Sequence, residues 1–219
     1  MKKFITLLLF CLLLAGCSSK HIPDWTYAGY NQLEDFKKAY LAGREKIAAL
    51  HFAKATEEIK KSGDLDVLAQ AHLTKYAVQT ALLERIDDSC YLKIAAVQST
   101  PENSNYYDFM KGRFDQADTR YLPEQYRNIV DALRRGNKTD ITAEGLKIND
   151  PLSRLIAVGI IIQYEECDEK LLQNAADTAS RNGWKKALLV YLEKLADYYK
   201  MKKEAEKEDR VRKRIDLMH

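Results

Sequence analysis

Two histidines have a spacing that could place them near each other. His51 and His72 lie on either side of a break at Ser62-Gly63, so an antiparallel pair of helices joined there would let the imidazoles approach. Two imidazoles can begin a metal site, but zinc needs a third or fourth ligand. No cysteine or carboxylate accompanies them at ligand spacing. We therefore expect packed histidines and no metal; the alternative is a small-ligand or metal-binding protein.

Adjacent acids occur twice, in a pattern that does not favour acid–base catalysis. The pairs Asp87-Asp88 and Glu165-Glu166 are neighbours in sequence, and neighbours on a helix point to different faces. Helix capping explains Asp87 and Asp88 better. The chain has no GxSxG, HExxH, P-loop or GxGxxG motif. We expect no catalytic residue and no cofactor; the alternative is an envelope enzyme that acts on peptidoglycan with acids from separate helices.

The N-terminus has the features of an export signal. Residues 1–17 read MKKFITLLLFCLLLAGC, with a positive start, a short apolar run and small residues before Cys17. The run is too short to be a transmembrane helix. The segment Leu14-Ala15-Gly16-Cys17 resembles the lipobox of bacterial lipoproteins, which implies cleavage before Cys17 and lipid attachment to that residue. Ser18, where Asp retains such proteins in the inner membrane of enteric-type bacteria, implies the outer membrane, facing the periplasm. The inner membrane is the alternative.

Removal of the signal leaves two cysteines for the fold, Cys90 and Cys167. In an oxidising compartment they can pair and close a long loop, which would stabilise the fold by a few kcal/mol. The alternative is two separate buried thiols. No CxxC motif is present, so neither a thioredoxin-like site nor a c-type haem is expected.

Composition favours helices and gives no sign of nucleic-acid binding. Ala and Leu number 51 against 21 Val and Ile, and the chain has only 9 Gly and 4 Pro; this balance argues against an all-β protein. The net charge is +3. It falls to +1 after signal removal, because Lys2 and Lys3 leave with the signal and no acid does. So weak a field gives no reason to expect nucleic acid as a partner.

The rest of the chain divides into helices at clear breaks. Apolar residues over 32–61 recur at spacings of three, four and seven, which predicts one helical face. Ser62-Gly63-Asp64 then ends that helix and caps the next, which continues to about residue 84. Further helices are expected at 90–98, 106–114, 123–135, 140–146, 151–166, 168–182, 184–201 and 203–217. The apolar run 155–162 is expected to be buried core.

Two segments resemble tetratricopeptide-like solenoids. They are Phe52-x-x-Ala55 before the Ser62-Gly63-Asp64 break, and Gly183-Trp184-x-x-Ala187-x-x-x-Tyr191. The resemblance implies an all-α fold of stacked antiparallel helix pairs with a concave face for a peptide or partner helix. An irregular helical bundle is the alternative.

These patterns divide the chain into three parts and lead to one functional expectation. Residues 1–16 are the signal, 17–30 the lipid anchor and tether, and 31–219 a single all-α domain. Within the tether, Trp25, Tyr27 and Tyr30 are expected to pack on the first helices; the alternative is a strip lying on the membrane or on a partner. We expect a lipid-anchored, periplasm-facing scaffold that binds a protein partner, in the manner of lipoproteins that help assemble envelope machines.

Overall fold

A computed structural model describes residues 23–218, and within them the fold is all-α. These residues form eleven α-helices and one short 3-10 helix, with no strand among them. The signal and Cys17 lie outside the described residues. In chain order the helices are α2 (Asp24–Leu41), α3 (Glu45–Lys60), α4 (Leu65–Ala81), α5 (Ser89–Ala95), α6 (Pro101–Met110), η1 (Thr119–Tyr121), α7 (Glu124–Arg135), α8 (Lys138–Lys147), α9 (Pro151–Tyr164), α10 (Glu169–Arg181), α11 (Lys185–Lys202) and α12 (Ala205–Asp216).

The helical body begins earlier than the boundary expected at residue 31. α2 starts at Asp24, an acid in the first turn, which is favourable at a helix N-terminus. Gly29 is buried, and a Cβ added there would meet a side chain of α3. The aromatic lead-in is therefore part of a packed helix, although Tyr27 and Tyr30 remain exposed on it.

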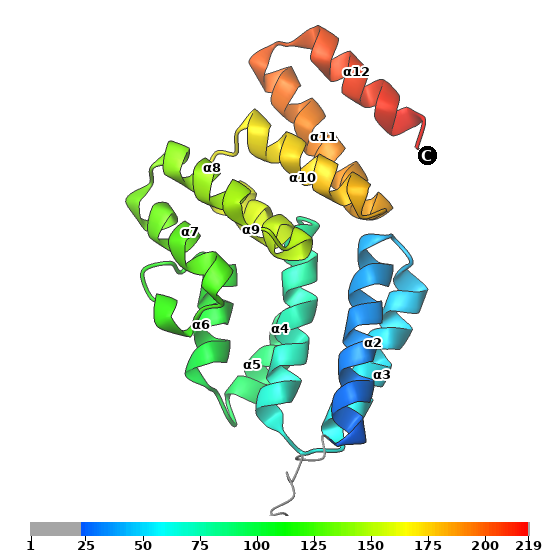
Figure 1. The fold of residues 1–219 in the computed structure, drawn as a ribbon, viewed down its shortest axis with the longest axis vertical. Helices are drawn as coiled ribbons and strands as arrows, with labels where there is room; N and C mark the ends of the chain where they lie inside the picture. Colours follow the sequence, from blue (N-terminus) through cyan, green and yellow to red (C-terminus); the bar gives the residue numbers. More distant parts are fainter. Residues whose placement is uncertain (1–22, 219) are drawn as a thin grey trace, which may run out of the picture.

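Two helices occupy the stretch for which apolar spacing predicts a single one. The chain reverses at Gly43, whose φ of +85° suits glycine and would strain other residues. As a result α2 and α3 pack side by side along their length (Figure 1), and the rings of Phe36 and Phe52 lie 5.2 Å apart. The most extensive N-terminal packing is therefore between α2 and α3, not across the Ser62-Gly63-Asp64 break.

Side-chain caps confirm several of the predicted breaks. Asp64 accepts hydrogen bonds from two backbone N–H groups in the first turn of α4, at 2.9 and 3.1 Å. Asp150 and Asp168 cap α9 and α10 in the same way. Thr100 caps α6, which explains why that helix begins at Pro101 and not near residue 106.

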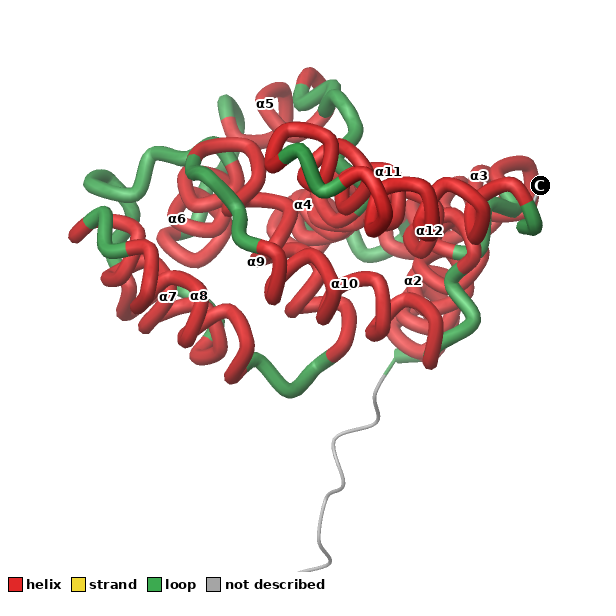
Figure 2. Tube along the Cα trace, turned by 90° about the horizontal axis from the view of Figure 1, so that it is seen from above, coloured by secondary structure: helices red, strands yellow, loops and turns green. Residues whose placement is uncertain are grey.

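Helices far apart in the sequence meet at the centre of the molecule. α4 packs against α9, and α11 reaches α2 (Figures 1 and 2). Only a glycine fits at position 159, because a Cβ there would lie 2.2 Å from the carbonyl oxygen of Thr80. The buried Tyr191 hydroxyl of α11 lies 2.8 Å from the Ala81 carbonyl oxygen and 3.0 Å from that of Leu155, so it can donate to either. Three helices are thereby joined at one point.

These contacts make the arrangement more closed than a simple stack of repeats. In a stack each unit touches only its neighbours, whereas here the first helix pair also touches α11. The predicted core run lies in α9, and residues 155–161 are all buried. Within residues 23–218, no helix combines the length and apolar character needed to cross a membrane.

Candidate functional site

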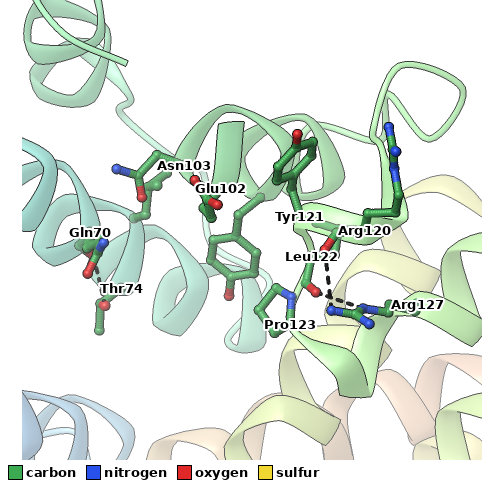
Figure 3. Close-up of a pocket in the computed structure, with 11 residues that line it drawn as sticks. Gln70, Thr74, Glu102, Asn103, Arg120, Tyr121, Leu122, Pro123 and Arg127 are labelled. Carbon is green, nitrogen blue, oxygen red and sulfur yellow. Dashed lines mark hydrogen bonds between the residues drawn. The ribbon is translucent and has the colours of Figure 1, made fainter. Parts of the chain in front are cut away.

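A groove between α4, α6 and the segment around η1 is the candidate site. It has a volume of about 520 Å³ and combines apolar, aromatic and charged side chains (Figure 3). Its lining residues are Gln70, Leu73, Thr74, Glu102, Asn103, Tyr106, Arg120, Tyr121, Leu122, Pro123 and Arg127. Volumes of this size accommodate small ligands or a few side chains of a bound peptide.

One wall of the groove comes from α4 and the start of α6. Thr74 donates a hydrogen bond to the carbonyl of Gln70 one turn earlier, at 2.9 Å, so both side chains lie on one face of α4. Leu73 is buried beneath them. The buried Asn103 side chain donates to the Asp66 carbonyl at 3.3 Å. This bond fastens the start of α6 to the start of α4 and so holds this wall of the groove together.

The opposite wall is the η1 segment, held by an arginine of α7. The Arg127 guanidinium donates to the carbonyl oxygens of Leu122 and Arg120, at 3.0 and 3.3 Å (Figure 3). Pro123 then leads into α7. Carbonyl groups of an irregular segment need partners when they are partly buried, and Arg127 supplies them here. Among residues 23–218 Arg127 has no ion pair, so its positive charge is not neutralised by a carboxylate.

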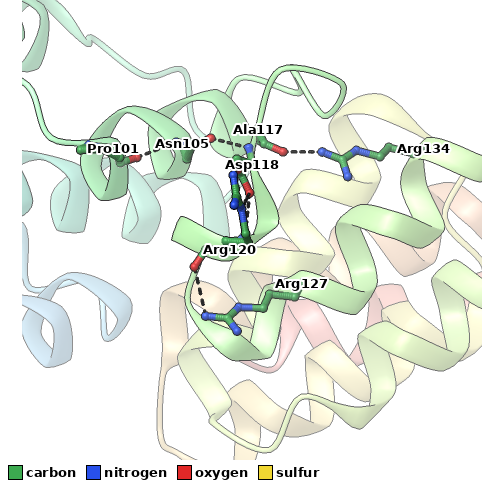
Figure 4. A network of polar contacts seen from close by, with 7 residues as sticks. All are labelled: Pro101, Asn105, Ala117, Asp118, Arg120, Arg127 and Arg134. Carbon is green, nitrogen blue, oxygen red and sulfur yellow. Dashed lines mark hydrogen bonds and ion pairs between the residues drawn. The ribbon is translucent and has the colours of Figure 1, made fainter.

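A second set of polar contacts fixes the same segment from behind (Figure 4). Arg134 of α7 donates to the carbonyl oxygens of Phe114 and Ala117. Asn105 of α6 accepts from the backbone N–H of Asp118. Hydrogen bonds from Arg120 lower the pKa of Asp118 from 3.8 to about 2. The η1 wall is therefore pinned by side chains of both α6 and α7.

Aromatic rings form a firm base beneath the groove. The ring of Tyr106, which lines the groove, stacks on that of Tyr126 at 6.0 Å. Tyr126 in turn lies 4.9 Å from Phe109, which is fully buried. Burial raises the pKa of Tyr126 well above its usual value, so the phenol stays protonated. A base of packed rings leaves little freedom for the groove to collapse.

The rim carries the residue types that dominate protein interfaces. Tyr121 is 38% exposed, and the Arg120 guanidinium lies 5.9 Å from the centre of its ring. Tyrosine and arginine are enriched among the residues that contribute most to protein binding. Glu102 provides a negative charge at the other side. The groove thus offers an apolar floor, with aromatic and charged groups around it.

A smaller hollow adjoins the groove and shares Gln70 and Thr74 with it. It measures about 370 Å³ and lies between α2, the end of α3 and α4. Its apolar lining is formed mainly by Trp25, Leu33, Ile59, Val67 and Ala71. One ridge of α4 therefore separates two hollows.

The two histidines have different partners. His51 shares a 2.8 Å hydrogen bond with Gln32 of α2, whereas His72 packs edge-on against Phe52, with ring centres 5.5 Å apart. Burial and the neighbouring Lys75 lower the pKa of His72, which keeps the imidazole neutral. In the described part of the chain, no group of three or more His, Cys, Asp or Glu residues could hold a metal ion.

The adjacent acids do not converge either. Asp87 accepts from the backbone N–H of Ser89 at 3.1 Å, just before α5, but Asp88 at the N-cap position makes no side-chain cap bond, contrary to the capping interpretation. Asp88 accepts from the Tyr107 hydroxyl at 2.7 Å, and this bond lowers its pKa. Glu166 pairs with Lys138 of α8. Asp87, Asp88 and Glu166 therefore each have a different partner.

One pair of carboxylates does meet, between α3 and the end of α4. Lys186 of α11 contacts Glu45 at 2.8 Å and Glu84 at 2.7 Å, beside a hollow of about 700 Å³. The Tyr40 hydroxyl also donates to Glu84, at 2.5 Å. The bond from Lys186 lowers the pKa of Glu45, whereas a general acid at neutral pH requires a raised pKa. The cluster acts as a polar link between α11 and the first helices.

The two cysteines are separate in the structure. Cys90 is exposed on α5, and Cys167 is partly buried between α9 and α10; both carry free thiols. The sequence leaves two possibilities, a disulfide or two separate buried thiols. The structure has separate thiols, but Cys90 is exposed and only Cys167 is partly buried. Burial raises the pKa of Cys167 to about 12.

Sequence reasoning did not identify the groove residues as a site. They are ordinary helix and loop residues, and they converge only when α4, α6 and α7 pack together. The Leu122-Pro123 break was the one local signal near them. In comparisons with family models, curated proteins and solved structures, none matches this chain.

Proposed function

We propose that this protein is a lipid-anchored helical scaffold that binds a protein partner through the groove between α4, α6 and η1. The observation that carries the proposal is the combination of an apolar floor with tyrosine and arginine at the rim. Such a surface suits a partner segment that inserts one or two apolar side chains and makes polar contacts around them.

The groove is built in a way that favours binding without rearrangement. Arg127 and Arg134 hold the η1 wall, and Asn103 fixes the opposite wall. A surface that is already ordered loses less conformational entropy when a partner binds. A short helix or an extended peptide of the partner is the expected ligand.

The anchor is the other half of the proposal and rests on the lipobox-like segment ending at Cys17. Ser18 favours the outer membrane, with the protein facing the periplasm. Mass spectrometry of the mature protein tests the lipid directly. The expected species begins at Cys17 and carries acyl chains, and Cys17→Ala abolishes both the added mass and membrane retention. A Cys17→Ala protein that stays in the membrane would contradict the anchor.

The groove is tested by obstructing it without disturbing the fold. Thr74 faces the groove, and its side chain bonds only within its own helix, so Thr74→Arg adds bulk and charge at little structural cost. Thr139→Arg on exposed α8 is the matched control. In affinity capture from detergent-solubilised envelopes at native expression, we expect the control to recover a reproducible partner and Thr74→Arg to lose it. Equal recovery with both variants, or no reproducible partner with the unmodified protein, overturns the proposal.

A further inference from the structure

Exposed apolar and aromatic side chains gather at the end of the molecule where the chain enters α2. The start of α2 and the α3–α4 turn lie at this end, at the bottom of Figure 1, and the α5–α6 connection reaches the same end on the far side of α4. Tyr27 is 57% exposed and Tyr30 62% exposed on α2, and Val97 in the α5–α6 connection is 76% exposed. Trp25, also on α2, lies partly exposed over the smaller hollow. We call the three α2 residues Trp25, Tyr27 and Tyr30 the entry-end surface.

The entry-end surface is not a frayed end of the fold. Immediately beneath it, Ile59, Leu68 and Ala71 form a small buried core of their own, on which side chains from α2 and α5 pack. Asn103 also ties α6 to α4 at this end. The exposed rings therefore project from an ordered base, and their exposure calls for something that covers them.

The length of the tether indicates what lies opposite. Pro23 comes only six positions after Cys17, so the residue that precedes α2 stands within about 20 Å of the lipidated residue at roughly 3.3 Å per residue. This step rests on the proposed anchor. An end held so close to the bilayer meets the lipid headgroups before it meets any more distant surface.

The residue types also suit a bilayer surface. Tryptophan and tyrosine concentrate where membrane and water meet, because their rings are apolar and their N–H or O–H groups remain in the hydrated zone. Charge contributes little: Lys60 and Lys61 lie at this end, but so do Asp24 and Asp64. Contact through rings and not through charge predicts a weak dependence on salt.

We propose that the entry-end surface lies against the headgroup region of the bilayer, so that the lipid on Cys17 and the rings of α2 hold the protein upright on the membrane. The long axis then projects away from the bilayer, and the groove opens beside the membrane.

The chain provides its own probes, because its only tryptophans are Trp25 and Trp184. Trp184 immediately precedes α11, beside the far end of α2, where Lys186 of α11 approaches Gly43. Sixteen residues of α2, 26–41, lie between Trp25 and that far end, which is about 24 Å at 1.5 Å per residue. Trp184→Phe leaves Trp25 as the sole reporter, and Trp25→Phe leaves Trp184 as the matched control.

The experiment uses the full mature lipidated protein in phosphatidylethanolamine–phosphatidylglycerol vesicles, with lipids brominated near the headgroup end of the acyl chains as quenchers. We expect the emission of Trp25 to fall by about half and to shift to shorter wavelength, as for a ring at the interface, and that of Trp184 to stay unchanged. Replacing the exposed Tyr27 and Tyr30 by Ser should weaken the quenching without unfolding the protein.

Vesicle flotation separates the two proposals. Protein that floats while Trp25 stays unquenched overturns membrane contact but leaves the anchor intact. Protein that does not float overturns both. Unquenched Trp25 that is nevertheless shielded from acrylamide in native envelopes assigns the surface to a protein partner, and likewise overturns the lipid proposal.

Discussion

The contact between α4 and α9 gives the sharpest prediction about stability, through Gly159. A Cβ at this position would lie 2.2 Å from the Thr80 carbonyl oxygen and 2.9 Å from the carbonyl carbon. Ordinary contacts begin at about 3.4 Å, so the two backbones must move apart by about 1 Å. No rotamer change can relieve this clash, because the atoms it meets belong to the backbone.

Two opposing effects set the change in the free energy of unfolding for Gly159→Ala. Overpacking of a well-packed core costs about 1–3 kcal/mol, and the rigid neighbour places this case at the upper end. Ala gains about 1 kcal/mol over Gly within a helix. For Gly159→Ala we therefore expect a net loss of about 2 kcal/mol in the free energy of unfolding, or a fall of about 4–8 °C in Tm for a chain of this size.

The assay is urea and thermal unfolding followed by circular dichroism at the helical band, with Gly29→Ala as the matched control. A Cβ at Gly29 would be tight only against the Ile59 side chain, at 3.1 Å, which can adjust, and would lie at an ordinary 3.8 Å from the Ala55 carbonyl oxygen. We expect the control to stay within about 1 kcal/mol of the unmodified protein. A Gly159→Ala protein as stable as the control would refute the close packing of α4 on α9.

Three further predictions concern other parts of the molecule. Tyr191→Phe removes the buried hydroxyl that joins three helices, and urea unfolding should show a loss of about 1–2 kcal/mol; no loss would show that the bond is dispensable. The folded-state pKa of Asp118 is about 2 and lies below its ordinary value of 3.8. The ionised Asp118 carboxylate therefore stabilises the folded state above about pH 4, and this stabilisation is lost as the pH falls through about 2. The unmodified protein should accordingly exceed Asp118→Asn in stability at pH 6, and most of the difference should be lost by about pH 2; a gap unchanged at low pH contradicts the Arg120 pairing. Iodoacetamide should modify exposed Cys90 before Cys167, whose pKa is about 12, as peptide mapping would show, and the reverse order contradicts the burial.

Local sequence signals were sufficient for much of the helical fold. Asp64, Asp150 and Asp168 stand at helix starts because their carboxylates satisfy backbone N–H groups there, and that chemistry is local. The apolar run 155–162 could be read as core for a similar reason, since its composition leaves no polar face. Helix periodicity and caps therefore predicted the elements well wherever neighbouring residues decide the outcome.

The reversal at Gly43 shows where local reasoning fails. The apolar spacing continues through Gly43 without a break, so it predicts one helix where the structure has α2 and α3. That reversal brings α2 alongside α3, where His51 shares its hydrogen bond with Gln32 of α2. The groove was missed for a related reason: the roles of Arg127 and Arg134 depend on backbone carbonyl groups of a distant segment, which no sequence spacing reveals.

We propose that a protein partner binds in the groove between α4, α6 and η1. Site-specific photocrosslinking in growing cells can capture that partner in place, with a photoreactive residue at Tyr121 on the rim and, as control, at Tyr164 on α9. The two positions are matched in exposure, at 38% and 43%. The proposal predicts a discrete adduct of constant size from position 121 and none from position 164. No adduct from position 121, or the same adducts from both positions, would contradict it.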